Sequence, residues 1–207
     1  RIEVIPNGID LQPFLDPPQP KQKHELGIPD SAVLMIYVGR LSEEKNPSIL
    51  LEQYAIAAEI LPHLHFCIVG TGVAEEELKR FAANLPCGDR IHFTGAVPYQ
   101  EIPNLLAAAD FFATASVTEV HPLTVIEAMA AGLPIAATRS PGMIDSVTNT
   151  VSGFLATEPE QGLGAAMVGL AASPELRRKM GVAARTDSKR YDIRLTVAKT
   201  VELYDQL

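Results

Sequence analysis

The sequence has only two cysteines and no pattern of metal ligands. Cys67 lies in an apolar run and Cys87 in the loop-like segment PCGD, and the chain has no CxxC pair and no group of histidines at metal-ligand spacing. Structural zinc sites depend on such groupings. The scarcity of cysteine therefore predicts a protein of a reducing compartment, with no metal site.

Long hydrophobic runs and an excess of positive charge are also missing. No apolar run approaches the roughly 20 residues needed to span a bilayer, and no basic segment followed by an apolar one opens the chain. The net charge of -8 leaves no basic footprint for nucleic acid or an anionic membrane, so any positive patch must be small. With 47% hydrophobic residues among 207, the composition predicts a soluble globular protein.

Short β-branched runs alternate with segments of helical periodicity along the chain. Most of the runs are continuously apolar, which is typical of strands that are covered on both faces. Alternation of such strands with helices predicts a doubly wound parallel α/β sheet. The expected strands are residues 2–5, 33–38, 65–69, 91–94, 111–114, 134–137 and 153–156.

The loop GRLSEEKN is the first candidate site, because ligands of open parallel sheets bind beyond the carboxyl ends of the strands. Gly39 and Arg40 directly follow an expected strand, and Lys45 lies five residues further on. Glycine lets the backbone approach a ligand, while Arg and Lys offer charge-assisted donors that suit a phosphate or diphosphate. The alternative is a solvated loop in which the two cations pair with Glu43 and Glu44.

The loop VGTGVAEEEL superficially suggests a dinucleotide-binding fingerprint. Gly70 and Gly72 are in place, but the third glycine of GxGxxG is missing because Glu75 stands there. Three acids in the first helical turn would repel a pyrophosphate, and they complement the helix dipole instead. The sequence thus argues against NAD as a cofactor.

The loop HFTGAVPYQEI is small and apolar where it leaves its strand. The backbone of Gly95, Ala96 and Val97 can hold a flat base by main-chain hydrogen bonds before Pro98 opens another helix. The alternative is an ordinary tight turn between a strand and a helix.

The stretch TEVHPLTVIEA contains the start of a predicted helix. Pro122 suits the first helical position and Gly132 the position just past the end, so the helix should run from about 122 to 131. Free N–H groups near Leu123 and Thr124 would make this helix start an anion site.

Two carboxylates flank that helix start. Glu119 lies in the preceding loop and Glu127 on the second turn of the helix. A carboxylate accepts hydrogen bonds, which fits a ligand rich in hydroxyl groups, such as a sugar or a ribose. The alternative is one acid at a helix terminus and one solvated acid. His121, between them, is expected to have no chemical role, and Asp110 is expected to cap or turn the chain.

In this order, the segments resemble the C-terminal, donor-binding domain of the retaining glycosyltransferases of family four (group 1). These enzymes have the GT-B architecture of two facing Rossmann-like domains. The resemblance covers essentially all 207 residues and rests on IPNGID, VGRLSEEKN, IVGTG, IHFTGAV and SGFL, and above all on the E-x7-E spacing in EVHPLTVIEAMAAGLPIAA. It implies a Rossmann-like doubly wound parallel sheet.

The resemblance also implies which residues carry the chemistry. Arg40 and Lys45 match the basic pair that binds the donor diphosphate and stabilises charge on the leaving group. Glu119 matches the acid that contacts hydroxyls of the donor sugar. These three positions are the implied catalytic residues, and no metal is expected.

Further positions match the groups that bind the donor nucleotide. Glu127 matches the acid that holds the ribose, and the backbone near Gly39, Leu123 and Thr124 would approach the phosphates, with the backbone around Val97 at the base.

One departure from the family pattern lies beside the sugar. Many members have a Gly-Phe-Gly type segment where this chain has Val120, His121 and Pro122, so backbone freedom is lost there.

The predicted activity is transfer of a sugar from a nucleotide diphosphate donor, UDP-linked, to an acceptor hydroxyl with retention of configuration. No cofactor or nucleic-acid partner is expected. The alternatives are a sugar-nucleotide epimerase, a phosphorylase, or a nucleotide-binding module without chemistry of its own. TEVHPLT is also similar to lipid-directed glucosyltransferases of this family, so the implied acceptor is a glycan or a lipid.

We expect residues 1–207 to form a single donor-binding domain of a longer protein, whose N-terminal acceptor domain is not in this chain. The resemblance implies a cytoplasmic protein that reaches a membrane surface only through that other domain. In the family the last helix, here about 192–207, commonly crosses to the other domain; the alternative is packing on its own domain. The chain alone is expected to bind nucleotide weakly without turnover.

Overall fold

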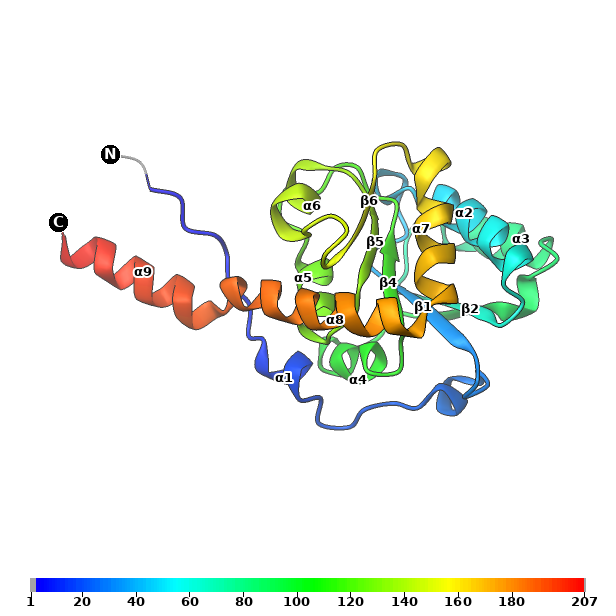
Figure 1. The fold of residues 1–207 in the computed structure, drawn as a ribbon, viewed down its shortest axis with the longest axis horizontal. Coiled ribbons are helices and arrows are strands. Elements are labelled where there is room, and N and C mark those ends of the chain that lie inside the picture. Colours follow the sequence, from blue (N-terminus) through cyan, green and yellow to red (C-terminus); the bar gives the residue numbers. More distant parts are fainter. Residues whose placement is uncertain (1–2, 207) are drawn as a thin grey trace.

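The computed structural model describes residues 3–206 and has one parallel sheet between two layers of helices (Figure 1). All neighbouring strands are parallel, and their order is β3-β2-β1-β4-β5-β6. This confirms the predicted doubly wound, Rossmann-like fold. The strands are β1 (Val33–Val38), β2 (Leu64–Val69), β3 (Ile91–Gly95), β4 (Phe111–Thr114), β5 (Ile135–Thr138) and β6 (Gly153–Ala156).

Helices connect successive strands and cover both faces of the sheet. The α-helices are α1 (Gln12–Leu15), α2 (Pro47–Ile60), α3 (Glu75–Ala83), α4 (Ile102–Leu106), α5 (Leu123–Ala130), α6 (Pro141–Ser146), α7 (Pro159–Ala172), α8 (Pro174–Ser188) and α9 (Ile193–Asp205). Single 3₁₀ turns are η1 (Lys23–Leu26), η2 (Glu43–Lys45), η3 (Gly88–Arg90), η4 (Tyr99–Glu101) and η5 (Lys189–Tyr191).

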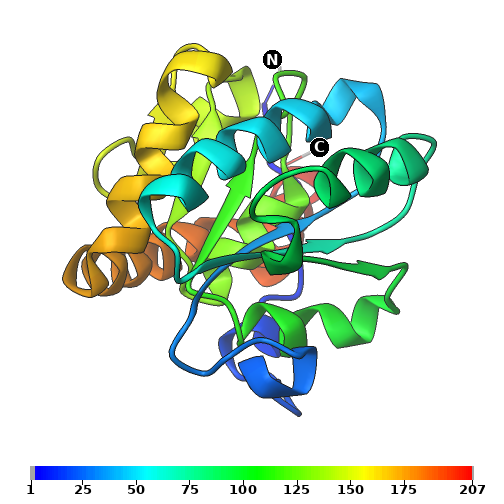
Figure 2. The same ribbon diagram turned by 90° about the vertical axis from the view of Figure 1, so that its right-hand side faces the viewer.

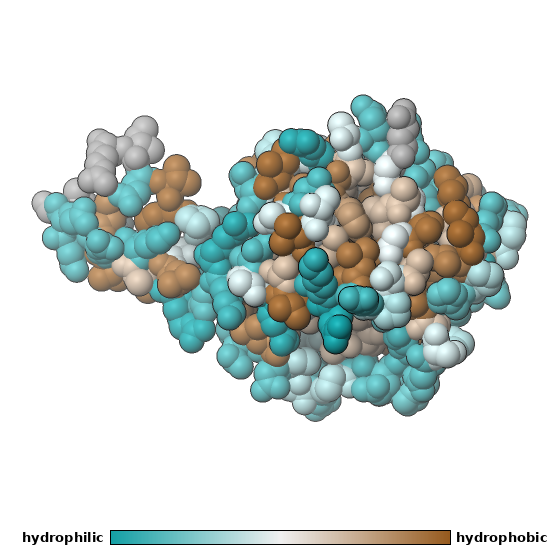
Figure 3. Space-filling view, in the orientation of Figure 1, coloured by the Kyte–Doolittle hydropathy of each residue, from teal (hydrophilic) through white to brown (hydrophobic). Residues whose placement is uncertain are grey.

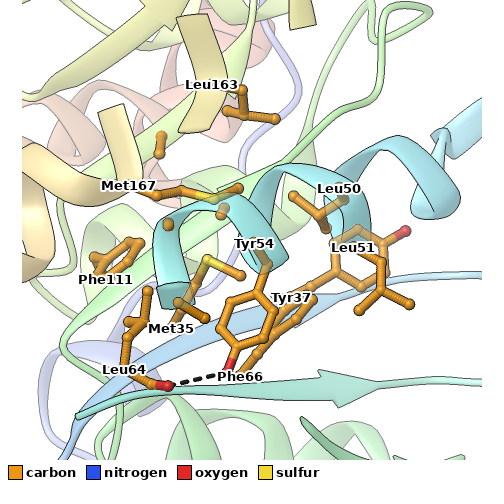
Figure 4. Close-up of a cluster of buried hydrophobic side chains, with 14 of the residues drawn as sticks. Met35, Tyr37, Leu50, Leu51, Tyr54, Leu64, Phe66, Phe111, Leu163 and Met167 are labelled. Carbon is orange, nitrogen blue, oxygen red and sulfur yellow. Dashed lines mark hydrogen bonds between the residues drawn. The ribbon is translucent and has the colours of Figure 1, made fainter. Parts of the chain in front are cut away.

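The sheet separates two hydrophobic cores. Successive strand residues point to opposite faces, so Met35 packs under α2 and α7 while Leu34 and Ile36 pack towards α4 and α5. Figure 2 shows α2 and α7 on one side of the sheet and α4 on the other. In the first core the Tyr54 hydroxyl donates to the carbonyl of Leu64 at 2.9 Å (Figure 4). The buried phenol is thereby satisfied.

Two local predictions are confirmed at the helix and strand ends. Helix α5 begins at Leu123 and ends at Ala130, within one residue of the predicted bounds at each end. Asp110 has a structural role, because its Oδ2 accepts from the backbone N–H of Leu34 at 2.7 Å and lies 2.6 Å from the ammonium of Lys23. It ties the start of β1 to the start of β4.

The predicted strand at residues 2–5 is wrong for the residues that the structure describes, and Ile2 lies outside them. Residues 3–8 form no regular element, and Val4 is 85% exposed. The segment runs beside α9, away from the sheet, so its apolar pattern has no strand to pair with (Figure 1). Its end is fixed by Ile9, whose N–H donates to the carbonyl of Tyr191 at 2.9 Å.

Helix α9 projects from the body of the domain (Figure 1). None of its residues is buried, and Val197, Val201 and Tyr204 are 53–71% exposed. The space-filling view shows apolar surface on this projection (Figure 3). Packing of α9 on its own domain is therefore not what the structure shows. No helix within residues 3–206 combines the length and apolar character that a membrane crossing requires.

Candidate functional site

The loops that follow β1, β2, β3 and β4 meet at the carboxyl edge of the sheet, where two cavities lie side by side. Their volumes are about 300 and 350 Å³, and both are lined by Val38, Gly39 and Arg40. We call the two cavities together the groove. The smaller cavity reaches the loop after β3, and the larger one reaches the start of α5. The crossover between β1 and β4, where connections leave to opposite sides, is the usual ligand position of this fold.

The structure brings the predicted site residues together around this groove. The larger cavity is lined by Lys45, Glu119, Leu123 and Thr124, and the smaller one by Val97. Glu127 is buried and does not line either cavity. Seven of the eight predicted positions thus line one or both of these adjoining cavities, although they come from segments up to 85 residues apart.

Lys45 and Glu119 form an ion pair in the wall of the groove. The Lys45 ammonium lies 2.5 Å from Glu119 Oε1, and both side chains are about one-fifth exposed. The alternative in which Lys45 pairs with Glu43 or Glu44 is wrong, since its carboxylate partner comes from the far loop. Ion pairs shielded from water are stronger than exposed ones. The pair leaves a positive group beside a carboxylate that can accept from hydroxyls.

Arg40 lies at the entrance of the groove and is mostly exposed. Its side chain is 78% exposed and lies 3.4 Å from Glu44 Oε1. This contact agrees with the alternative of a surface cation paired in its own loop. An exposed pair of this kind is weak, so the guanidinium is free to turn towards a ligand anion.

Among the acids within residues 3–206, Glu127 is the one whose side chain is buried away from water. Its side chain is 5% exposed, and Tyr99 donates its hydroxyl hydrogen to Glu127 Oε1 at 2.9 Å. Burial raises the pKa of the Glu127 carboxyl to about 7, and the hydrogen bond from Tyr99 lowers it only in part. The alternative of a solvated acid is therefore wrong. Sequence reasoning missed Tyr99, although it follows Pro98 in a loop already singled out.

The start of α5 presents free donors to the groove. The carbonyl of Pro122 accepts from the N–H groups of Val125 and Ile126 at 3.1 and 3.0 Å. Within residues 3–206, the N–H groups of Leu123 and Thr124 have no protein acceptor. Open N–H groups and the helix dipole together favour an anion at this end.

Gly70 belongs to the GxG that superficially resembles a dinucleotide-binding fingerprint, and its role here is to let two loops pack together. Its φ is +130°, and a side chain there would approach the Gly39 carbonyl to 2.0 Å. The glycine therefore lets the loop after β2 lie against the loop after β1. Glu75, Glu76 and Glu77 occupy the first turn of α3, as predicted.

The chain matches known proteins over nearly its whole length. Residues 18–187 match the profile of the family described as "Glycosyl transferases group 1". A "D-inositol 3-phosphate glycosyltransferase" of Segniliparus rotundus is 32% identical over 197 residues, covering 92% of this chain and 44% of that protein. A "UDP-Gal:alpha-D-GlcNAc-diphosphoundecaprenol alpha-1,3-galactosyltransferase" of Escherichia coli is 34% identical over 161 residues, covering 75% and 41%.

A solved structure shares the fold as well. Anabaena Alr3699/HepE in complex with UDP superposes with a TM-score of 0.87 at 24% identity, covering 99% of this chain and 57% of that one. The chain spans less than half the length of the two curated relatives named above. Because the family profile covers most of its residues, the chain belongs to the group 1 glycosyltransferases.

Proposed function

We propose that this chain binds the donor in a glycosyltransferase that moves a sugar from a UDP-linked donor to an acceptor hydroxyl with retention of configuration. The observation that carries the proposal is the groove itself. It joins the Lys45–Glu119 ion pair to the open N–H groups of α5, and the buried Glu127 lies on the second turn of the same helix. A sugar diphosphate nucleotide carries sugar hydroxyls next to a charged diphosphate, and the groove likewise offers an acceptor, Glu119, next to the donors Lys45, Arg40 and the N–H groups of α5.

In this proposal the positive groups stabilise the leaving group. Breaking the glycosyl bond builds negative charge on the diphosphate and positive character on the sugar ring. Lys45, Arg40 and the N–H groups of Leu123 and Thr124 would meet the diphosphate, and preorganised donors cost no reorganisation during the reaction. Glu119 would accept from sugar hydroxyls and Glu127 from the ribose. The backbone around Val97 would hold the base.

The names of relatives support the choice of donor and acceptor. The E. coli relative is named for a UDP-linked galactose and a diphosphoundecaprenol acceptor, and the Anabaena structure contains UDP. We therefore propose a UDP-sugar as donor and a glycan or lipid-linked hydroxyl as acceptor. The acceptor would be held by a part of the protein outside these residues.

A panel of nucleotides tests the donor proposal. We expect UDP and a UDP-sugar to raise the melting temperature of the chain more than GDP-mannose does, and NAD to leave it unchanged. A ligand at 100 times its Kd stabilises a protein by about 2.7 kcal/mol, which is roughly 5–10 °C for a chain of this size. Differential scanning fluorimetry measures the shift. Stabilisation by NAD alone would contradict the proposal.

Replacement of Arg40 tests the diphosphate contact. We expect Arg40→Ala to weaken UDP binding about 10-fold, because one charge-assisted hydrogen bond contributes roughly 1.5–3 kcal/mol. Since Arg40 is mostly exposed, the melting temperature of the free protein should not change. Arg80→Ala, at an exposed arginine of α3 outside the groove, is the matched control. Isothermal titration calorimetry gives both affinities, and equal values would remove Arg40 from the site.

A further inference from the structure

The loop between β4 and α5, residues 115–122, carries Glu119, and its apolar anchorage lies at its two ends, where Ala115 and Pro122 are buried. Val117 is 43% exposed and Val120 is 80% exposed. Polar contacts hold the loop on two sides. On the side of the loop after β1, Lys45, Asn46 and Glu44 contact Glu119, Ala115 and Thr118. On the opposite side, two contacts tie the loop to α6 and to the segment before α1. The Glu119 carbonyl accepts from the N–H of Gly142 at 2.8 Å, and the ring nitrogen Nε2 of His121 lies 2.9 Å from the carbonyl oxygen of Asn7. Because a carbonyl only accepts, Nε2 of His121 carries the proton and donates.

Both of these last contacts lead to η5, the short turn before α9. The ring of His121 meets the ring of Tyr191 edge to face, with centroids 5.6 Å apart. Tyr191 donates its hydroxyl hydrogen to the carbonyl of Asp145 at 3.2 Å, and Arg190 donates to the same carbonyl at 2.6 Å. Since Asp145 belongs to α6, which also contains Gly142, the turn η5 holds the helix that holds Glu119.

The segment before α1 completes the connection. The N–H of Ile9 donates to the carbonyl of Tyr191 at 2.9 Å, and the N–H of Ile193 donates to the carbonyl of Ile9 at 3.0 Å. Asn7, which His121 contacts, lies two residues before Ile9. His121 is therefore the only residue of the loop 115–122 for which the described chain shows a side-chain contact with both the incoming segment and η5.

We propose that His121 is a positioning residue, which holds Glu119 against the sugar end of the donor by fastening its loop to Asn7 and Tyr191. The inference rests on the donor site proposed above and concerns only its sugar end. His121 lines the same cavity as Lys45 and Glu119. Where the family pattern has glycines and a flexible backbone, this chain has a His121 ring that contacts Asn7 and Tyr191. If the segment 3–9 or α9 moved relative to the domain, the contacts of His121 would shift the loop that carries Glu119.

Two substitutions separate the hydrogen bond from the ring packing. His121→Phe keeps a ring against Tyr191 and removes the donor to Asn7, whereas His121→Gln places an amide N–H close to the position of Nε2. His63→Phe, at an exposed histidine far from the groove, is the matched control. Isothermal titration calorimetry with UDP and with the tightest-binding of UDP-glucose, UDP-galactose and UDP-N-acetylglucosamine gives the affinity of each variant for nucleotide and for donor.

We expect His121→Phe to bind UDP within twofold of the wild type and the UDP-sugar about 3- to 10-fold more weakly, the loss expected for one hydrogen bond. His121→Gln should restore most of the donor affinity. An equal loss for UDP and UDP-sugar, or no loss for either, would overturn the proposal. If the wild type itself binds no nucleotide, the proposed donor site is wrong. That result is separate from any difference between the wild type and the His121 variants.

Amide hydrogen exchange of the free protein gives a second readout that needs no ligand. Exchange at residues 117–121 should be faster in His121→Phe than in the wild type, and should return towards the wild-type rate in His121→Gln. The control His63→Phe should leave this loop unchanged. Wild-type exchange rates in His121→Phe would show that the loop is held without the histidine, and would refute its positioning role.

Discussion

Replacing Glu127 with glutamine is expected to make the free protein more stable at pH 8 while weakening its binding of a UDP-sugar. The carboxyl is 5% exposed, and burial raises its pKa from 4.5 to about 7. Ionisation of a buried group is unfavourable unless a ligand or a cation compensates it. Among the described residues the only hydrogen-bond donor shown for it is the Tyr99 hydroxyl, from which the amide oxygen of a glutamine could equally accept. The substitution therefore removes a charge and keeps the contact.

The sign of the pH dependence follows from the raised pKa. The folded protein holds a proton that the unfolded chain releases near pH 4.5, so the stabilisation is complete below pH 4.5 and is lost as the pH rises through 7. The loss amounts to roughly 3 kcal/mol at pH 8. Glu127→Gln should therefore melt roughly 6–12 °C higher than the wild type at pH 8 and within about 2 °C of it at pH 4.5.

Donor binding should have the opposite dependence. Ribose hydroxyls donate hydrogen bonds and so favour the ionised carboxylate, which means that binding releases a proton near neutral pH. The affinity of the wild type for UDP-glucose should rise between pH 6 and pH 8. That donor is the better probe, because neither of its esterified phosphates titrates in this range. Glu127→Gln should bind it about 30- to 100-fold more weakly, with no such rise, because two charge-assisted hydrogen bonds become neutral ones and each weakens by roughly 1.0–1.4 kcal/mol.

Calorimetry in buffers of different ionisation enthalpy measures the released proton directly. Glu52→Gln, at an exposed position of α2, is the matched control and should change neither the melting curve nor the affinity. A wild-type stability that does not fall between pH 5 and pH 8 would contradict the burial argument. An unchanged affinity in Glu127→Gln would place the ribose elsewhere.

Most of the fold could be predicted from the alternation of apolar runs and helical segments along the sequence. Three of the predicted strands, 33–38, 111–114 and 153–156, have the bounds that the structure shows, because continuous apolar runs between helical segments occur where a strand is covered on both faces. The strand predicted at residues 3–5 is wrong because the same kind of local pattern occurs there without a partner strand. Val4 and Ile5 are apolar and β-branched, but the pattern alone does not reveal that this segment pairs with no strand among the described residues.

The pairing of site residues could not be predicted in the same way. Lys45 and Glu119 are 74 residues apart, and the local alternative, a pair with Glu43 or Glu44, satisfies every rule of spacing. Only the order of strands decides which loops meet, because β1 and β4 are neighbours and their loops leave the same edge. The Tyr99–Glu127 contact was missed for the same reason. The sequence predicts which residues lie at the ends of the strands. Which of these residues contact one another depends on the order of the strands in the sheet.

Gly142→Ala is expected to displace the loop that carries Glu119, with a large loss of donor affinity. A Cβ built on Gly142 would lie 2.5 Å from the carbonyl oxygen of Val120 and 2.9 Å from that of Glu119. Both neighbours are backbone atoms, so no side chain can rotate to relieve the contact. The Gly142 N–H also donates to the Glu119 carbonyl at 2.8 Å, and this bond holds the loop against the helix at the point of the clash.

The loop must therefore move or the bond must break. Overpacking of this kind costs about 1–3 kcal/mol of stability, and displacement of a positioned group by about 1 Å can lower activity roughly 100-fold. We expect Gly142→Ala to bind a UDP-sugar at least 10-fold more weakly, the affinity being measured by isothermal titration calorimetry.

The same substitution in α7 should behave in the opposite way. A Cβ at Gly169 would have its nearest neighbour at 3.9 Å, an ordinary contact with the ring of Phe154. Because alanine is favoured over glycine inside a helix, Gly169→Ala should raise stability by up to about 1 kcal/mol and leave donor affinity unchanged. If Gly142→Ala lowers stability and Gly169→Ala raises it, the loss in Gly142→Ala comes from crowding of the loop and not from the added methyl group as such. If Gly142→Ala kept both stability and affinity, the loop would have room to yield, and α6 could not be what fixes Glu119 in the groove.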